Sequence, residues 1–63
     1  MNDFRTRLIE EHQSVEDRLN KLLVFIKSDK LTSIPTIQQV LLKAQYNAML
    51  TYEIILRERI NLL

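Results

Sequence analysis

Apolar residues recur along residues 3–28 at the spacing of one helical face. The positions are separated by four, seven, four, three and four residues: Phe4, Leu8, Val15, Leu19, Leu22 and Ile26. Side chains three, four or seven residues apart share one face of an α-helix. The pattern therefore predicts an amphipathic helix over about 3–28, with Asn2 as its N-cap and Asp3 in its first turn.

The apolar pattern of residues 36–62 is wider and predicts a second helix. One stripe comprises Ile37, Leu41, Ala44, Ala48, Tyr52, Ile55 and Leu62, and an adjacent stripe comprises Leu42, Met49, Leu56, Ile60 and Leu63. At about 100° per residue, the two stripes merge into an apolar arc of roughly 160° to 180°. An ordinary surface helix carries a stripe of little more than about 100°. One partner helix cannot cover the wider arc, so the pattern predicts self-association.

A short turn over about 29–35 is expected to join the two helices. It holds the only proline, Pro35, and the chain has no glycine. We expect Leu31 and Ile34 to fold back over the end of the hairpin. Proline is common at the start of a helix, and Thr36 with Gln39 forms the T-x-x-Q pattern of a capping box.

The length of the chain points to the same architecture. Sixty-three residues form one small unit, and a unit of this size buries only about 60% of its unfolded surface. Small proteins compensate with disulfides, metals or oligomerisation, but this chain has no cysteine and only one histidine. The sequence therefore predicts an all-α fold: residues 1–63 form an antiparallel two-helix hairpin that assembles into a homo-oligomeric helical bundle.

Composition narrows the possible functions. Nine basic and eight acidic residues give a net charge of +1, which weighs against binding to polymeric nucleic acid. No apolar run approaches the ~20 residues that span a bilayer, and no signal-peptide pattern is present. The expected location is therefore cytoplasmic. The chain lacks glycine-rich phosphate loops and the G-x-S-x-G and H-E-x-x-H motifs, so we expect a non-enzyme without a cofactor or metal.

Two polar residues on the first apolar face need an explanation. Glu11 lies between Leu8 and Val15, where a carboxylate must find a partner or stay out of the core. A hydrogen bond from the Tyr52 hydroxyl, fixing the register of the hairpin, is the favoured interpretation. Direct contact of Glu11 with a ligand is the alternative. His12 is expected on the flank of the face, without a catalytic or metal role.

Cationic residues provide the other candidates. Arg59 lies near the middle of the second apolar arc, where it is paired, extends to water at the helix end, or faces a site formed by several chains. A polar flank on the first helix comprises Arg7, Ser14, Arg18, Lys21 and Phe25. Such a flank could bind phosphates and stack a base, although its periodicity also fits an ordinary solvated face.

Residue types at fixed offsets in both helices match a known family. The second helix carries Q-x-x-A-M-x-x-Y over 45–52 and then R-I at 59–60, and the first carries Arg7-Leu8, Glu11 and K-L-x-x-F-I over 21–26. Generic amphipathicity does not require this mixture of polar and apolar types. In these motifs the chain resembles the phage anti-CBASS sponges, small helical hairpins related to the anti-Thoeris sponge hairpin. The resemblance covers about residues 7–60, and Ile34-Pro35 stands where the family carries L-P.

The resemblance implies a function. Anti-CBASS sponges bind cyclic dinucleotides or trinucleotides made by a bacterial alarm system and hold them without cleavage, so that the immune effector stays inactive. They form compact hexamers with pockets between protomers. By resemblance, this chain is expected to be a phage protein of immune evasion, a cyclic-nucleotide-binding homohexamer in the host cytoplasm.

Five residues are expected to bind ligand. Lys21 stands at the family's pocket lysine, which pairs with a phosphate, and Arg59 stands at the arginine that can face a three-chain pocket for cyclic trinucleotides. Arg7 matches the arginine of the family's R-V pair. The expected ligand-binding residues are Lys21, Arg59, Arg7, Phe4 and Phe25. Leu23 departs from the family where a hydroxyl residue can help to hold the ligand, and Phe4 retains stacking but lacks a polar contact.

Two other functions compete with sequestration. One is a small helical bundle that binds nucleic acid on a helix face, against which the balanced charge weighs. The other is an interaction module that uses its wide apolar face to bind a helix of another protein.

Overall fold

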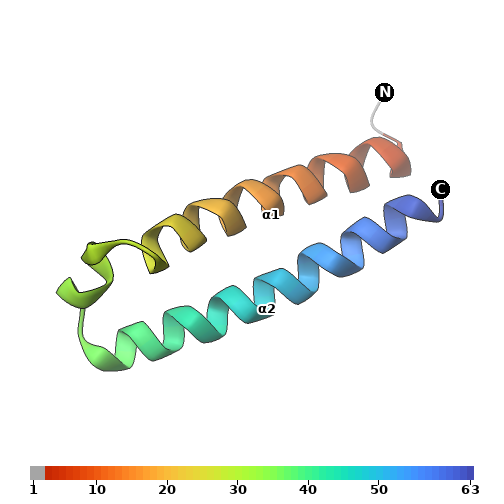
Figure 1. The fold of residues 1–63 in the computed structure, drawn as a ribbon. Helices are drawn as coiled ribbons and strands as arrows, with labels where there is room; N and C mark the ends of the chain where they lie inside the picture. The colour runs from red at the N-terminus through yellow and green to blue at the C-terminus, as the bar shows by residue number, and fades with distance from the viewer. Residues whose placement is uncertain (1–2) are drawn as a thin grey trace.

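Two antiparallel helices form a hairpin in the computed structural model, which describes residues 3–63 (Figure 1). Helix α1 spans Phe4–Ile26, the short 3-10 helix η1 spans Asp29–Ser33, and α2 spans Thr36–Asn61. The start of α1 and the end of α2 lie together at one end of a body of 44 × 18 × 14 Å. The predicted all-helical hairpin is confirmed. Neither helix has a stretch that is long and apolar enough to cross a membrane, within the described residues.

The start of α1 is one residue from where the sequence placed it. Asp3 is the N-cap, with an extended backbone, and its carboxylate accepts a hydrogen bond of 2.9 Å from the backbone N–H of Thr6. This bond lowers the pKa of Asp3, because it stabilises the ionised carboxylate. The assignment of the cap to Asn2 is therefore corrected, and Asn2 itself lies outside the described residues.

Side-chain hydroxyls stabilise the connection between the helices. Ser28 donates a hydrogen bond of 2.7 Å to the carbonyl of Phe25 at the end of α1, and its hydroxyl accepts one from the backbone N–H of Lys30. Leu31 in η1 is 9% exposed and closes the end of the hairpin, as expected, while Ile34 is half-buried.

The start of α2 corrects a second cap prediction. Pro35 is the N-cap and Thr36 is already the first helical residue, so no side-chain hydroxyl caps the helix. The side-chain amide of Gln39 donates a hydrogen bond of 2.9 Å to the carbonyl of Ile34. The capping-box prediction was wrong because the helix begins one residue earlier than the T-x-x-Q pattern implied.

Only one of the two predicted stripes of α2 faces α1. Leu56 is completely buried against Leu8 and Val15, and Ile60 packs against the same cluster. The other stripe, which we call the outer stripe, is largely exposed: its members Ile37, Leu41, Tyr52, Ile55 and Leu62 have exposed fractions of 64%, 55%, 41%, 51% and 86%. A single partner helix therefore leaves an unburied apolar surface, as the sequence predicted.

Leu56→Ala tests the location of the core. Removal of a fully buried leucine leaves a cavity, so we expect the free energy of unfolding to fall by about 2–5 kcal/mol. Leu41→Ala is the matched control on the outer stripe and should cost the hairpin much less. Urea unfolding at low protein concentration gives both values, and equal losses would contradict the assigned core.

Candidate functional site

Residues from both ends of the chain line a groove at the open end of the hairpin. This terminal groove has a volume of about 290 Å³ and is lined by Phe4, Arg7, Leu8, Glu11 and Arg59. Four of these residues come from the first two turns of α1, and Arg59 comes from the last turn of α2. The antiparallel hairpin brings them together because the start of α1 and the end of α2 are adjacent (Figure 1).

A cation–π contact organises the terminal groove. The guanidinium carbon of Arg59 lies 5.9 Å from the centroid of the Phe4 ring, within the range of this interaction. Both side chains are exposed. Arg59 lines the groove and forms no ion pair in the part of the chain that the structure describes. Extension to water at the helix end and a site formed by several chains are the alternatives that remain for it.

A second groove continues along the same face of the hairpin. This central groove has a volume of about 370 Å³ and is lined by Val15, Arg18, Leu22, Gln45, Met49 and Tyr52. Positions 4, 8, 11, 15, 18 and 22 of α1 follow one another at helical spacing, so both grooves use one face of this helix. Arg18 of the predicted polar flank therefore lies beside apolar surface, in a setting that suits a flat anionic ligand.

The predicted bond between Tyr52 and Glu11 does not form. Both residues are exposed, and Tyr52 lines the central groove while Glu11 lines the terminal groove. No hydrogen bond joins them in the described residues. The prediction was wrong because Glu11 lies at the edge of the seam between the helices, where water solvates its carboxylate.

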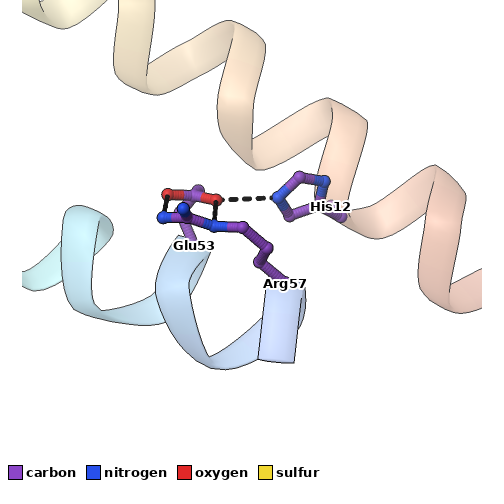
Figure 2. Close-up of polar contacts among 3 residues, drawn as sticks. All are labelled: His12, Glu53 and Arg57. Atoms are coloured by element: carbon purple, nitrogen blue, oxygen red, sulfur yellow. Dashed lines mark hydrogen bonds and ion pairs between the residues drawn. The ribbon is translucent and has the colours of Figure 1, made fainter. Parts of the chain in front are cut away.

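A buried carboxylate does form a polar contact between the two helices, but it belongs to Glu53 and not to Glu11. Glu53 is 6% exposed and contacts His12 at 2.8 Å and Arg57 at 2.9 and 3.1 Å (Figure 2). His12 lies on α1, whereas Glu53 and Arg57 are one turn apart on α2. We call these three residues the seam clamp. The burial of Glu53 could have been predicted from the sequence, because Glu53 continues the spacing of Met49, Leu56 and Ile60 on the buried stripe.

The seam clamp keeps Glu53 ionised. The hydrogen bond with His12 is the main cause that lowers the pKa of Glu53, and Arg57 adds to it, while burial acts in the opposite direction. A buried carboxylate with both oxygens bound is satisfied and holds the helices in register. Glu16 offers a further oxygen, and the ligand atoms of His12, Glu16 and Glu53 lie within 4.8 Å of one another. A divalent cation there would compete with the existing partners of Glu53, so the contacts are explained structurally.

Two predicted ligand-binding residues lie outside both grooves. Lys21 is exposed and Phe25 is half-buried, near the turn end of α1. Fourteen residues separate Lys21 from Arg7, which corresponds to about 21 Å along the helix. One chain therefore brings together Phe4, Arg7 and Arg59, and leaves Lys21 and Phe25 at the opposite end.

Comparison with known proteins supplies the family. The family model described as Sequestin matches residues 2–62. The chain belongs to the Sequestin family. The Sequestin name points to sequestration, which agrees with the expected sponge at the level of a protein that binds and holds a ligand. No curated protein and no solved structure matches the chain.

The pH dependence of stability tests the seam clamp of this Sequestin-family chain. Because the pKa of Glu53 is lower in the folded protein, its ionised form contributes stability above the unfolded pKa, and this contribution disappears as the pH falls through the folded pKa. Glu53→Gln removes the titrating group and should lower the free energy of unfolding by about 1–3 kcal/mol near neutral pH.

Urea unfolding of the wild type and Glu53→Gln checks this between about pH 6 and about pH 3. The stability difference between the two proteins should shrink as the pH falls below the ordinary glutamate value of 4.5. Glu58→Gln, at an exposed position of α2, is the control. A difference that stays constant across this range would contradict an ionised Glu53 in the clamp.

Proposed function

We propose that this protein binds cyclic oligonucleotide second messengers and sequesters them without cleavage, which blocks CBASS signalling in the infected bacterium. The observation that carries the proposal is the terminal groove. It gathers an aromatic ring and two guanidinium groups, from Phe4, Arg7 and Arg59. All three were expected to bind ligand by resemblance to the sponges, and the Sequestin family name supports sequestration.

The chemistry of the groove suits an anionic ligand with a flat base. A guanidinium group offers a planar fork of N–H donors that binds two phosphate oxygens at once. Stacking of a nucleobase on an aromatic side chain contributes about 1–3 kcal/mol. Contact with the Phe4 ring restricts Arg59 before a ligand arrives, which reduces the entropy lost on binding.

We further propose that the complete pocket needs more than one chain. Lys21 and Phe25 lie at the turn end of α1, far from the terminal groove. The outer stripe of α2 provides an apolar surface through which copies of the chain can associate. A hexamer with pockets between protomers, as in the anti-CBASS sponges, would bring Lys21 of one copy toward the cations of another.

A second candidate function rests on the same outer stripe. Ile37, Leu41 and Ile55 at helical spacing form a surface that could bind an amphipathic helix of another protein. This alternative predicts a hairpin that stays monomeric or dimeric by itself, whereas the proposed sponge is a larger assembly. The terminal groove, whose aromatic ring and two guanidinium groups suit an anionic ligand, favours sequestration.

Arg59→Ala tests the terminal groove. Loss of a charge-assisted hydrogen bond costs about 1.5–3 kcal/mol, so the affinity for a cyclic trinucleotide should fall by roughly 10- to 150-fold. Arg5→Ala is the matched control, because Arg5 is an exposed arginine of the same end and does not line the groove. Lys21→Ala should weaken the binding of cyclic dinucleotides more than the binding of cyclic trinucleotides.

Isothermal titration calorimetry against cyclic di- and trinucleotides measures these changes. Chromatography of the ligand recovered after denaturation should return it intact, as sequestration requires. Failure of the wild type to bind any cyclic nucleotide, or recovery of a cleaved product, would contradict the proposal. Loss of affinity with Arg5→Ala equal to that with Arg59→Ala would place the site elsewhere.

Leu41→Glu tests the outer stripe as the surface between copies. A carboxylate in an apolar interface is left without its water, so we expect the assembly to dissociate toward single hairpins. Native mass spectrometry and light scattering measure the mass of the particle. Asn47→Glu, on an exposed polar position of α2, is the control and should leave the mass unchanged. A wild-type protein that is monomeric at micromolar concentration would contradict the proposed assembly.

A further inference from the structure

The terminal groove contains one residue that phosphate binding does not explain. Glu11 lies on α1 one turn beyond Arg7 and lines the groove with Phe4 and Arg59. A carboxylate repels the phosphates of a cyclic nucleotide and weakens the attraction of neighbouring cations. Its presence in a groove for an anionic ligand therefore calls for a contact with another part of that ligand.

The carboxylate of Glu11 is not bound by the neighbouring polar side chains of the described hairpin. In residues 3–63 it forms no ion pair with Arg7 or Arg59 and no hydrogen bond with Tyr52. Glu53, by contrast, has both of its oxygens bound within the seam clamp. Both carboxylate oxygens of Glu11 therefore remain available to a ligand in the groove.

Hydrogen-bond chemistry restricts which base can use these oxygens. An ionised carboxylate is an acceptor only, with two oxygens side by side. On its Watson–Crick edge, guanine presents two adjacent donors, the N1–H and the N2 amino group. Adenine presents one donor, the N6 amino group, beside the acceptor N1. A carboxylate can therefore bind guanine through two hydrogen bonds, whereas it meets a repulsive lone pair on adenine.

We propose that Glu11 is the specificity-determining residue of the terminal groove and selects guanine-containing cyclic nucleotides. Its two oxygens accept hydrogen bonds from N1–H and the N2 amino group of a guanine base. The Phe4 ring contacts the face of that base, and Arg7 and Arg59 bind the adjoining phosphates. This inference rests on the proposed function and adds to it the class of base that is recognised.

Glu11→Gln provides the sharpest test, because it replaces one acceptor by a donor with almost no change in shape. A glutamine amide matches the donor and acceptor of adenine and mismatches guanine. We expect the wild type to bind cyclic tri-GMP more tightly than cyclic tri-AMP by roughly 5- to 150-fold, the discrimination of a bidentate base contact. In Glu11→Gln this ratio should collapse or reverse.

Two further measurements, one with another ligand and one with another variant, distinguish recognition of the base from simple removal of a charge. Cyclic tri-IMP lacks the N2 amino group, so it should bind the wild type less tightly than cyclic tri-GMP and lose less affinity in Glu11→Gln. Glu10→Gln removes one negative charge at the neighbouring exposed position, which does not line the groove, and should preserve the guanine preference. Circular dichroism checks that each variant stays helical.

Dissociation constants measured by calorimetry for the three ligands test whether Glu11 selects guanine. Equal affinity of the wild type for cyclic tri-GMP and cyclic tri-AMP would overturn the inference and leave the proposed function standing. An unchanged ratio in Glu11→Gln would do the same, as would an equal gain for every ligand, since that gain reports only relief of phosphate repulsion. Absence of any binding by the wild type would overturn the proposed function and this inference together.

Discussion

The hairpin depends on a limit of geometry: each helix has only one partner, and one partner covers only one stripe. Helix α2 carries two apolar stripes. The stripe that contains Leu56 is buried against α1, while the stripe that contains Leu41 and Ile55 stays exposed. Apolar burial is the main favourable term in folding and in association, so the surface that the hairpin leaves uncovered is a driving force for assembly. In the proposed assembly, folding and self-association would draw on two adjacent faces of the same helix.

Buried charge decides how the two helices are aligned. Apolar contacts along a seam tolerate sliding by a turn, whereas a buried carboxylate tolerates only the register in which its partners reach it. Glu53 has its partners when His12 lies opposite and Arg57 follows one turn later. The same register places the last turn of α2 beside the first turns of α1. The contact between Arg59 and Phe4, and with it the terminal groove, occurs in the register in which the seam clamp forms.

The sequence predicted those features that follow from periodicity and failed where two similar residues competed for one role. The two helices, the turn and the buried Leu31 follow from spacing and from the single proline. The buried polar pair was expected, but at Glu11. Helical spacing alone does not rank Glu11 against Glu53, because each lies among apolar neighbours and the outcome depends on the angle at which the helices meet. The N-cap of α1 differs by one residue for a similar reason, since Asn2 and Asp3 are both good N-caps.

The candidate site could be predicted only in part, because one hairpin does not hold all of it. Phe4, Arg7 and Arg59 meet because the start of α1 and the end of α2 are adjacent, but Lys21 lies about 21 Å from Arg7. No rotation of side chains within a rod of 44 × 18 × 14 Å closes that separation. In the proposed assembly, copies packed antiparallel through the outer stripe place the turn end of one hairpin beside the open end of the next. Ligand binding and assembly would then be linked, because a ligand held by two copies stabilises the assembly that forms its pocket.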